Sequence, residues 1–204
     1  MNYMRITKEN IDKEHICCAM SGKQSIAKKE WMKQRFEEGL VFYRSEERGK
    51  CFIEYIPAEN AWIPIEANGW IYINCLWVSG GMKGHGYSNE LLGECIRDAR
   101  AKRKTGVCIL CAEGRKREFL ADPKFLKYKG FKTADISDCG ISLMYLPFVP
   151  TAELPKFREC ARYPKVAEDG FVLYYTDQCP YTYYWVPKVQ EVAKEHEIGR
   201  ASCR

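Results

Sequence analysis

The stretch that decides the fold is Leu76-Trp-Val-Ser-Gly-Gly-Met-Lys-Gly-His-Gly-Tyr-Ser-Asn-Glu-Leu-Leu92. It begins inside an apolar run, Trp70 to Val78, that predicts a strand buried in the middle of a sheet. A glycine-rich turn over Ser79 to Tyr87 follows, and Ser88 to Lys102 then has apolar residues at helical spacing. Successive N–H groups in such a turn, together with the free N–H groups of a helix N-terminus, form a concave anion site. The stretch therefore predicts a phosphate-binding turn between a central strand and a helix.

A glycine and a lysine in this turn favour the binding of a phosphate group. Gly86 can adopt a positive φ and lets a diphosphate approach the backbone closely, and Lys83 adds a positive charge. The strand that ends near Val78 can offer its backbone groups to an extended arm that carries amides. A turn of this kind also occurs without any ligand, so a purely structural interpretation stays open. A dinucleotide site is disfavoured, because Lys102 to Gly106 lie where its acidic residue is expected.

Further elements surround this unit on both sides. Helices are predicted over Asn10 to Met20 and Ser25 to Glu38, with Gly39 ending the second. Apolar runs and turn residues predict the other elements: strands over Leu40 to Arg44, Cys51 to Ile56, Val107 to Cys111, Phe131 to Ile136 and Ile141 to Phe148, and a partly helical segment over Arg117 to Lys129. The strand–helix–strand unit in this order is a parallel crossover. We expect an α/β (α+β) fold with a mixed central sheet flanked by helices.

Composition bounds the function. The chain has 204 residues, 46% of them hydrophobic, so a sizeable core can form. A net charge of +5 suits an anionic ligand but is too dilute to indicate nucleic acid. No apolar run approaches the roughly 20 residues of a membrane span, and Met1 to Lys8 is too polar for a signal peptide. Eleven cysteines are therefore expected to be reduced thiols in a cytoplasmic protein that binds neither nucleic acid nor membrane.

The C-terminal part is expected to be organised separately. Prolines after residue 146 mark a boundary, so residues 149–169 are interpreted as a linker and residues 170–196 as a partial β-α unit. Its predicted strand covers Gly170 to Tyr175 and its predicted helix Val186 to Glu195. Between them, Cys179 precedes the helix, where a thiol can be activated. Residues 197–204 are expected to be a non-native tail, with the natural chain continuing beyond His196.

The turn resembles the acetyl-CoA-binding motif of GNAT N-acetyltransferases, which is Arg/Gln-x-x-Gly-x-Gly/Ala between a strand and a helix. Lys83 stands for Arg or Gln, Gly86 is the central glycine, and Ser88 stands for Gly or Ala. The Tyr128-Lys-Gly-Phe131 segment resembles the way in which family members close a later helix. The resemblance covers residues 1–148 and implies an acyl-CoA N-acyltransferase fold.

This resemblance implies an acyltransferase that moves acetyl from acetyl-CoA, its co-substrate, to an amine acceptor. Whether it acts as a monomer or a homodimer stays open. The residues that it places around acetyl-CoA are Leu76, Trp77, Val78, Met82, Lys83, Gly84, His85, Gly86, Tyr87 and Ser88. The C-terminal unit resembles the small thioredoxin-like domain, called YoaP-like, that is appended to some bacterial GNAT proteins.

Catalytic residues are less clearly marked. Acetyl transfer needs a neutral amine and a protonated leaving thiolate. The central strand carries no carboxylate, so Glu54 on its neighbour and Glu66 are the candidates for the base, of which Glu54 is preferred. The position of the family's usual acid, a tyrosine, holds Leu126, and Tyr128 lies two residues later as the remaining candidate. A surface or packing role for each of these residues stays open.

Other cysteine patterns lead to one alternative function. Cys108 and Cys111 are three apart on a predicted strand and point to opposite faces, so they are expected to form neither a disulfide nor a metal site. No second pair lies at zinc spacing, and no metal is expected. Because the usual acid and base are displaced, the alternative is a non-catalytic CoA-binding or thiol-sensing module with a reactive Cys179.

Overall fold

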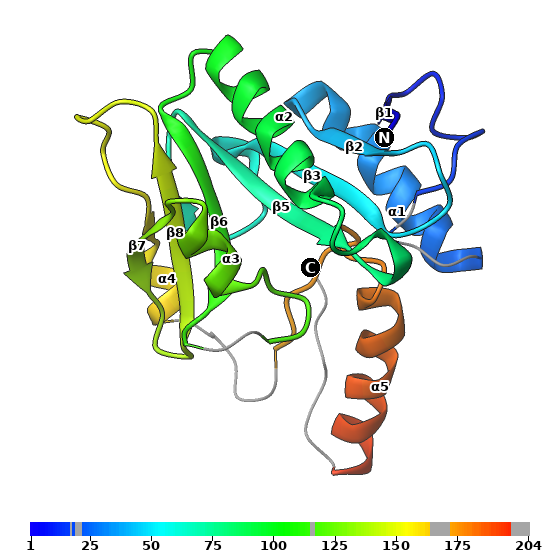
Figure 1. The fold of residues 1–204 in the computed structure, drawn as a ribbon. Coiled ribbons are helices and arrows are strands. Elements are labelled where there is room, and N and C mark those ends of the chain that lie inside the picture. Colours follow the sequence, from blue (N-terminus) through cyan, green and yellow to red (C-terminus); the bar gives the residue numbers. More distant parts are fainter. Residues whose placement is uncertain (17, 19–21, 115–116, 164–171, 197–204) are drawn as a thin grey trace.

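A seven-stranded mixed sheet forms the centre of the protein (Figure 1). The computed structural model describes residues 1–16, 18, 22–114, 117–163 and 172–196. Its elements in chain order are β1 Tyr3–Ile6, α1 Gly22–Arg35, β2 Val41–Ser45, β3 Cys51–Pro57, β4 Ile65–Glu66, β5 Trp70–Val78, α2 Tyr87–Ala101, β6 Gly106–Ala112, α3 Pro123–Tyr128, β7 Lys132–Ile136, β8 Ile141–Pro147, β9 Lys156–Phe157, α4 Glu159–Arg162 and α5 Thr182–Glu195.

The order of strands in this sheet is β1-β2-β3-β5-β6-β8-β7. All neighbours are antiparallel except β5 and β6, which are parallel and joined by α2. This confirms the predicted crossover, and β5 has the bounds that the apolar run predicted. The crossover places the turn before α2 at the end of the central strand, where α/β folds commonly bind ligands.

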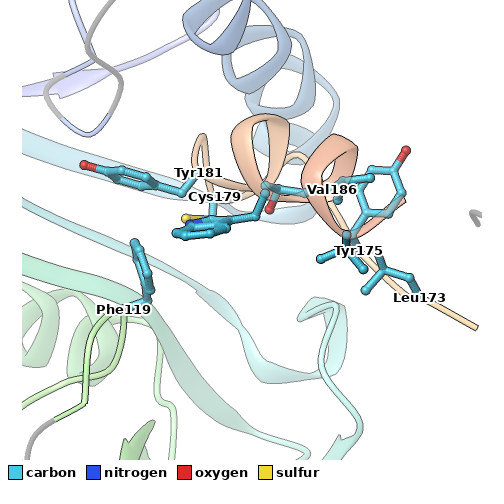
Figure 2. A pocket seen from close by; sticks show the side chains of 9 residues that line it. Phe119, Leu173, Tyr175, Cys179, Tyr181 and Val186 are labelled. Carbon is cyan, nitrogen blue, oxygen red and sulfur yellow. The ribbon is translucent and has the colours of Figure 1, made fainter. Parts of the chain in front are cut away.

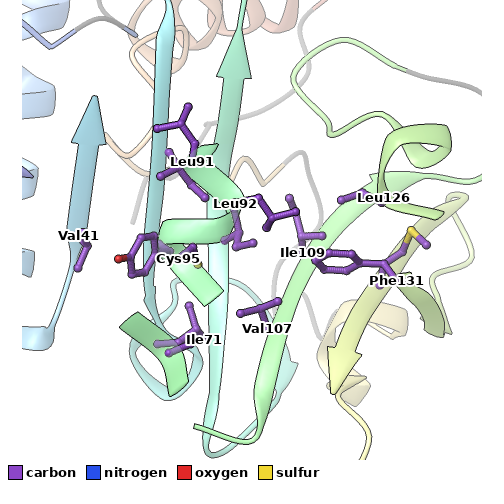
Figure 3. Packing of buried hydrophobic residues seen from close by; sticks show 14 of the residues in the cluster. Val41, Ile71, Leu91, Leu92, Cys95, Val107, Ile109, Leu126 and Phe131 are labelled. Atoms are coloured by element: carbon purple, nitrogen blue, oxygen red, sulfur yellow. The ribbon is translucent and has the colours of Figure 1, made fainter. Parts of the chain in front are cut away.

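Helices cover both faces of the sheet. On one face, α2 and α3 pack on β5 and β6 through a core that includes Leu92, Ile109 and Leu126 (Figure 3). On the other face, α1 packs on β2 and β3 through Trp31, Met32 and other buried residues. Buried apolar side chains on both faces of the central strands explain why those strands read as continuous apolar runs.

The N-terminal prediction was wrong. Within Asn10 to Met20, the described residues form turns rather than a helix, because the Asn10 side chain bonds locally. Its Oδ1 accepts from the Thr7 N–H at 2.8 Å, and its Nδ2 donates to the Arg5 carbonyl at 2.9 Å. Asparagine in this pattern competes with helical hydrogen bonding. Ahead of it, β1 is an unpredicted edge strand that pairs with β2.

Two predicted helices have shifted bounds. The helix predicted over Ser25 to Glu38 begins earlier as α1 and ends in a 3-10 turn, Phe36–Glu38. Within Arg117 to Lys129 only α3 is helical, since Asp122 caps it by accepting from the Lys124 N–H at 2.9 Å and Pro123 follows the cap. Proline suits a first helical turn, whereas it would interrupt a longer helix.

The C-terminal part differs from the expected β-α unit. Residues 172–175 form no strand, whereas Gly170 and the tail 197–204 lie outside the described residues. The helix α5 begins four residues earlier than predicted and contains Pro187. Part of the expected linker packs on the main body, because β9 pairs with β4. A thioredoxin-like unit therefore finds no support in the described residues.

Candidate acetyl-transfer site

The central strands separate halfway along their length. Pairing joins β5 to β6 over four residue pairs, from Trp70–Gly106 to Ile73–Ile109. Beyond Ile73, β5 continues to Val78 while paired with β3 alone among the described strands. The half of β5 from Asn74 to Val78 therefore has a backbone edge toward β6 that no neighbouring strand occupies, and we call this part the free half of β5.

A β-bulge lies at the same point. The register between β3 and β5 passes from Glu54–Cys75 to Tyr55–Ile73, so Asn74 is the extra residue. A bulge bends its strand and changes which side chains share a face. As a result Ile73 and Leu76 pack with the α2 core, whereas Cys75 and Trp77 pack with the α1 core. Bulges of this kind are common beside active sites.

The predicted anion turn connects the free half of β5 to α2. It contains a 3-10 turn, Gly80–Met82, followed by Lys83 and the start of α2. Gly84 and Gly86 have φ angles of 83° and 82°, a left-handed conformation that residues with a side chain rarely adopt. Gly86 caps α2 without a side-chain hydrogen bond, and the Asn89 N–H donates to the Gly86 carbonyl at 2.8 Å. The N–H groups of Tyr87 and Ser88, which lie ahead of Asn89 in the first turn, are therefore the ones left to a ligand or solvent.

The structure places the predicted binding residues along this path. Leu76, Trp77 and Val78 lie on the free half of β5, and Met82 ends the 3-10 turn. The remaining six are Lys83, Gly84, His85 and Gly86 in the turn, and Tyr87 and Ser88 in the first turn of α2. The His85 and Tyr87 rings stack with centroids 5.5 Å apart. The predicted binding residues therefore follow one another along β5, the turn and the start of α2, and their role in binding stays a prediction.

Glu54 is buried on the α1 side of the bulge. Its side chain and that of Lys28 are each 1% exposed, and they form an ion pair. The other Glu54 oxygen accepts from Asn74 Nδ2 at 2.8 Å, and the Lys28 ammonium also donates to the Gln178 carbonyl. Lys28 is the residue that sequence reasoning missed, because a lysine on an amphipathic helix is normally exposed.

The other two catalytic candidates lie elsewhere. Tyr128 is 80% exposed on α3 and is covered only by the Lys129 ammonium, 4.7 Å from its ring centroid. Glu66 is on β4, where it forms an exposed ion pair with Lys156 at 2.9 Å. The structure therefore brings Glu54, but neither Tyr128 nor Glu66, to the bulge of β5.

The segment before α5 lies over the free half of β5. The Tyr181 ring is 6.3 Å from that of Trp77 and 5.0 Å from that of Phe119, which lies on the loop after β6. The Lys50 ammonium donates to the Tyr181 hydroxyl at 3.3 Å and lies 4.3 Å from the Trp77 ring centroid. Tyr181 therefore bridges the free half of β5 and the loop that follows β6.

A cavity of about 270 Å³ lies beside Tyr181 (Figure 2). It is lined by Phe119, Leu173, Tyr175, Cys179, Tyr181, Thr182, Trp185, Val186 and Val189. In Figure 2, Phe119 approaches from the loop after β6, opposite the side chains of the α5 segment. From the aromatic run before Pro187, Tyr181 and Trp185 border this open space.

Cys179 lies in this cavity as a half-buried thiol. Burial raises its pKa, and the N–H groups of Tyr181 and Thr182 and the charge of Lys28 oppose this effect without overcoming it. Burial also raises the pKa of Cys75 well above its usual value. Both groups are therefore held as neutral thiols rather than as reactive thiolates. Among the described residues, no three histidine, cysteine or acidic side chains form a metal-binding cluster.

Comparison with known proteins identifies the family. No family model matches the sequence. The chain is 42% identical over 202 residues to the uncharacterized N-acetyltransferase YoaP of Bacillus subtilis (strain 168), covering 97% of this chain and 80% of that protein. The chain belongs to the GNAT family of N-acetyltransferases. It is thus an acyltransferase, as the Lys83 to Ser88 turn predicted.

Solved structures of GNAT proteins share the fold. A ribosomal-protein-alanine N-acetyltransferase from Brucella melitensis superposes with a TM-score of 0.52 at 13% identity, over 72% of this chain and 100% of that chain. A proposed GNAT acetyltransferase from Desulfovibrio desulfuricans also has a TM-score of 0.52, at 12% identity over 72% and 99% of the two chains. In the part of the chain that the structure describes, no helix is long and apolar enough to cross a membrane.

Proposed function

We propose that this GNAT enzyme transfers the acetyl group of acetyl-CoA to a primary amine at the free half of β5. The observation that carries the proposal is the end of β5–β6 pairing at Ile73, directly before the turn that leads into α2. An unpaired strand edge can bind the amides of pantetheine as an added strand would. The following turn and the α2 N-terminus provide N–H groups for the diphosphate.

The proposed reaction uses the backbone N–H groups of the free half of β5 and the carboxylate of Glu54. The amine nitrogen attacks the thioester carbonyl carbon, the C–S bond breaks, and CoA leaves as a thiolate that takes a proton from solvent. Backbone N–H groups near Val78 would stabilise the oxyanion. We propose that Glu54, directly or through a water at Asn74, receives the amine proton, because it is the carboxylate held at the bulge. Tyr128 stays a prediction, and its exposure gives the role of acid no support.

A glycine substitution tests the turn. Gly86→Ala adds a Cβ that meets no atom within 4 Å, but it forces an alanine to adopt a φ of 82°. We expect the KM for acetyl-CoA to rise about tenfold, because the left-handed conformation costs about 1–2 kcal/mol. Gly93→Ala, inside α2 at ordinary φ with Arg97 Nη1 3.5 Å from the new Cβ, is the matched control and should leave KM unchanged. An unchanged KM in Gly86→Ala would contradict the proposed turn.

The amine reaction is tested by the release of CoA. Purified protein is mixed with acetyl-CoA and a broad panel of amines, and free CoA is followed with a thiol-detecting dye. Amine-dependent release supports the proposal. Binding of acetyl-CoA without release from any amine would instead favour a non-catalytic CoA-binding module. A thiol-sensing role for Cys179 has less support, because burial raises the pKa of its thiol.

The cysteines are the basis for a proposal about cellular location. The described cysteines from Cys51 to Cys179 are free thiols, which agrees with the reduced state expected in a cytoplasm. We therefore keep the proposal of a cytoplasmic enzyme. A homodimer stays a prediction that gel filtration would test.

A further inference from the structure

We propose that the aromatic cavity before α5 binds the acceptor, and that it selects a primary amine carried on a single aromatic ring or a branched apolar group. This inference rests on the proposed function for the direction of transfer. It goes beyond that function because it names the acceptor class and the residues that select it. We call the space lined by Phe119, Tyr181, Trp185 and their neighbours the aromatic cavity.

Position is the first argument. The aromatic cavity adjoins the free half of β5, because Tyr181 lies both in its lining and 6.3 Å from the Trp77 ring. Cys179, also in the lining, is close enough to Lys28 and Glu54 for their charges to act on its thiol. A molecule in the cavity would therefore have the proposed thioester edge on one side and the proposed base on another.

The chemistry of the lining is the second argument. Besides its aromatic residues, the lining contains the aliphatic side chains of Leu173, Val186 and Val189. Thr182 is the lining residue with an aliphatic hydroxyl group. Such a lining stabilises a ring or branched chain by removing it from water, whereas a charged or strongly polar body would lose its hydration without partners. The volume of about 270 Å³ equals that of roughly nine liquid waters, which gives room for one ring with a short chain.

The amine end also has matching groups. Phe119, Tyr181 and Trp185 line a second cavity of about 310 Å³, whose lining includes Glu118 and Gln24. Aromatic faces attract organic cations, and a carboxylate beside them supplies the opposite charge. An ammonium group that enters past Glu118 would thus be attracted before its body reaches the apolar walls. The shared aromatic residues join the charged entrance to the apolar cavity.

Backbone strain at Phe119 is independent support. Phe119 has φ of 63°, a conformation that is unusual for a bulky side chain. Its side chain is nevertheless 58% exposed, so burial in the core does not offset the strain. Strained residues that packing does not explain are concentrated at ligand sites. The strained backbone directs the Phe119 ring against Tyr181, which is the arrangement expected of a residue that contacts an acceptor.

Steady-state kinetics with matched amines tests this inference. We expect kcat/KM for 2-phenylethylamine and 3-methylbutylamine to exceed that for putrescine at least tenfold. Trp185→Ala and Phe119→Ala should each lower kcat/KM for 2-phenylethylamine about tenfold or more, with little change for putrescine and in the KM for acetyl-CoA. Tyr174→Ala removes an exposed aromatic residue outside the lining and is the control. Circular dichroism confirms that each variant is folded.

Equal use of all amines, or variants that slow every amine equally, would overturn the acceptor class while leaving the proposed function intact. If no amine releases CoA, the proposed function fails, and calorimetric titration of CoA-bound protein with 2-phenylethylamine still decides the cavity. Binding weakened at least tenfold by Trp185→Ala would support the cavity. No binding, or equal binding in the variant, would exclude it.

Discussion

Replacement of Glu54 by glutamine should destabilise the protein strongly, because it leaves a buried lysine without its counter-charge. Lys28 and Glu54 are each 1% exposed and form an ion pair. In Glu54→Gln, the new amide can still accept from Asn74, and the Gln178 carbonyl still accepts from Lys28. The loss is therefore that of one negative charge beside a desolvated ammonium.

The size of the effect follows from this burial. Removal of one partner of a buried pair costs about 3–5 kcal/mol, since the remaining charge has lost its water. For a chain of this length, 1 kcal/mol shifts Tm by about 2–4 °C, so Tm should fall by roughly 6–20 °C. Glu59→Gln, which removes the partner of Lys104 in an ion pair at the surface, should cost at most about 1 kcal/mol.

The assay combines thermal unfolding with kinetics. Differential scanning calorimetry of the wild type, Glu54→Gln, Glu59→Gln and the double variant Lys28→Met/Glu54→Gln gives the stabilities. The double variant should recover much of the loss, because the unpaired charge is gone. If Glu54 also takes the amine proton, kcat should be lower in the double variant than in Lys28→Met alone, although the stability of the double variant has recovered. That separation distinguishes a catalytic carboxylate from a structural one.

Two results would refute this reasoning. A Tm for Glu54→Gln equal to that of Glu59→Gln would mean that the pair is not desolvated as its geometry indicates. A stable double variant with wild-type kcat would leave Glu54 with a structural role alone. In that case the amine would have to bind in its neutral form or lose its proton to solvent.

Two further predictions concern the fold around the site. In Gly106→Ala the new Cβ would lie 2.5 Å from the Leu146 carbonyl oxygen, so denaturant unfolding should show a loss of about 1–3 kcal/mol or more; wild-type stability would contradict this packing. Burial raises the pKa of Asp135, but hydrogen bonds from the Phe157 N–H and from Arg162 lower it further, so the net pKa is lowered. A carboxyl group whose pKa is lower in the folded state stabilises the folded protein at pH values above its unfolded pKa of about 3.9. This stabilisation is lost as the pH falls through the folded-state pKa. Asp135→Asn should therefore be less stable than the wild type at pH 7, and the gap should shrink toward pH 3 in urea titrations; a gap independent of pH would refute the assignment.

The sequence predicted the central unit well because its signals are local. An uninterrupted apolar run predicts β5, and an apolar stripe at helical spacing predicts α2 within one residue at each end. The glycines between them have the positive φ that a tight turn requires. Each of these features depends on residues that are close in the chain, so no tertiary information was needed to find them.

The pairing at the edges of the fold was not predictable in the same way. The four residues of β1 are too few for a pattern, and β2, at Val41–Ser45, supplies their hydrogen bonds. Asn10 was predicted to begin a helix, but its side chain bonds to both sides of a local turn. A cap and such a turn use the same residue types, so propensity alone does not separate them.

The site itself required contacts between distant segments. Lys28 and Glu54 are 26 residues apart, and Gln178 is 150 residues from Lys28. A lysine in the sequence Lys28-Lys29 predicts a solvated helix surface, and nothing local marks the first of the two as buried. Glu54 was found from its strand alone, but its ion pair was not. The approach of Tyr181 to Phe119, which lie 62 residues apart in the sequence, was likewise beyond local inference.

The contacts of Lys28 connect the two halves of the proposed site. Its ammonium bonds both to Glu54, the proposed base, and to the Gln178 carbonyl in the segment that leads to Cys179 and Tyr181. The same group thus fixes the carboxylate and the wall of the aromatic cavity relative to each other. Because the Lys28 side chain is 1% exposed, a shift of the wall would cost the ammonium a partner that water does not readily replace. Through this contact, the segment around Gln178 is packed against the body that carries Glu54. For the same reason Lys28→Met alone should change acceptor discrimination as well as stability, whereas Glu59→Gln should change neither.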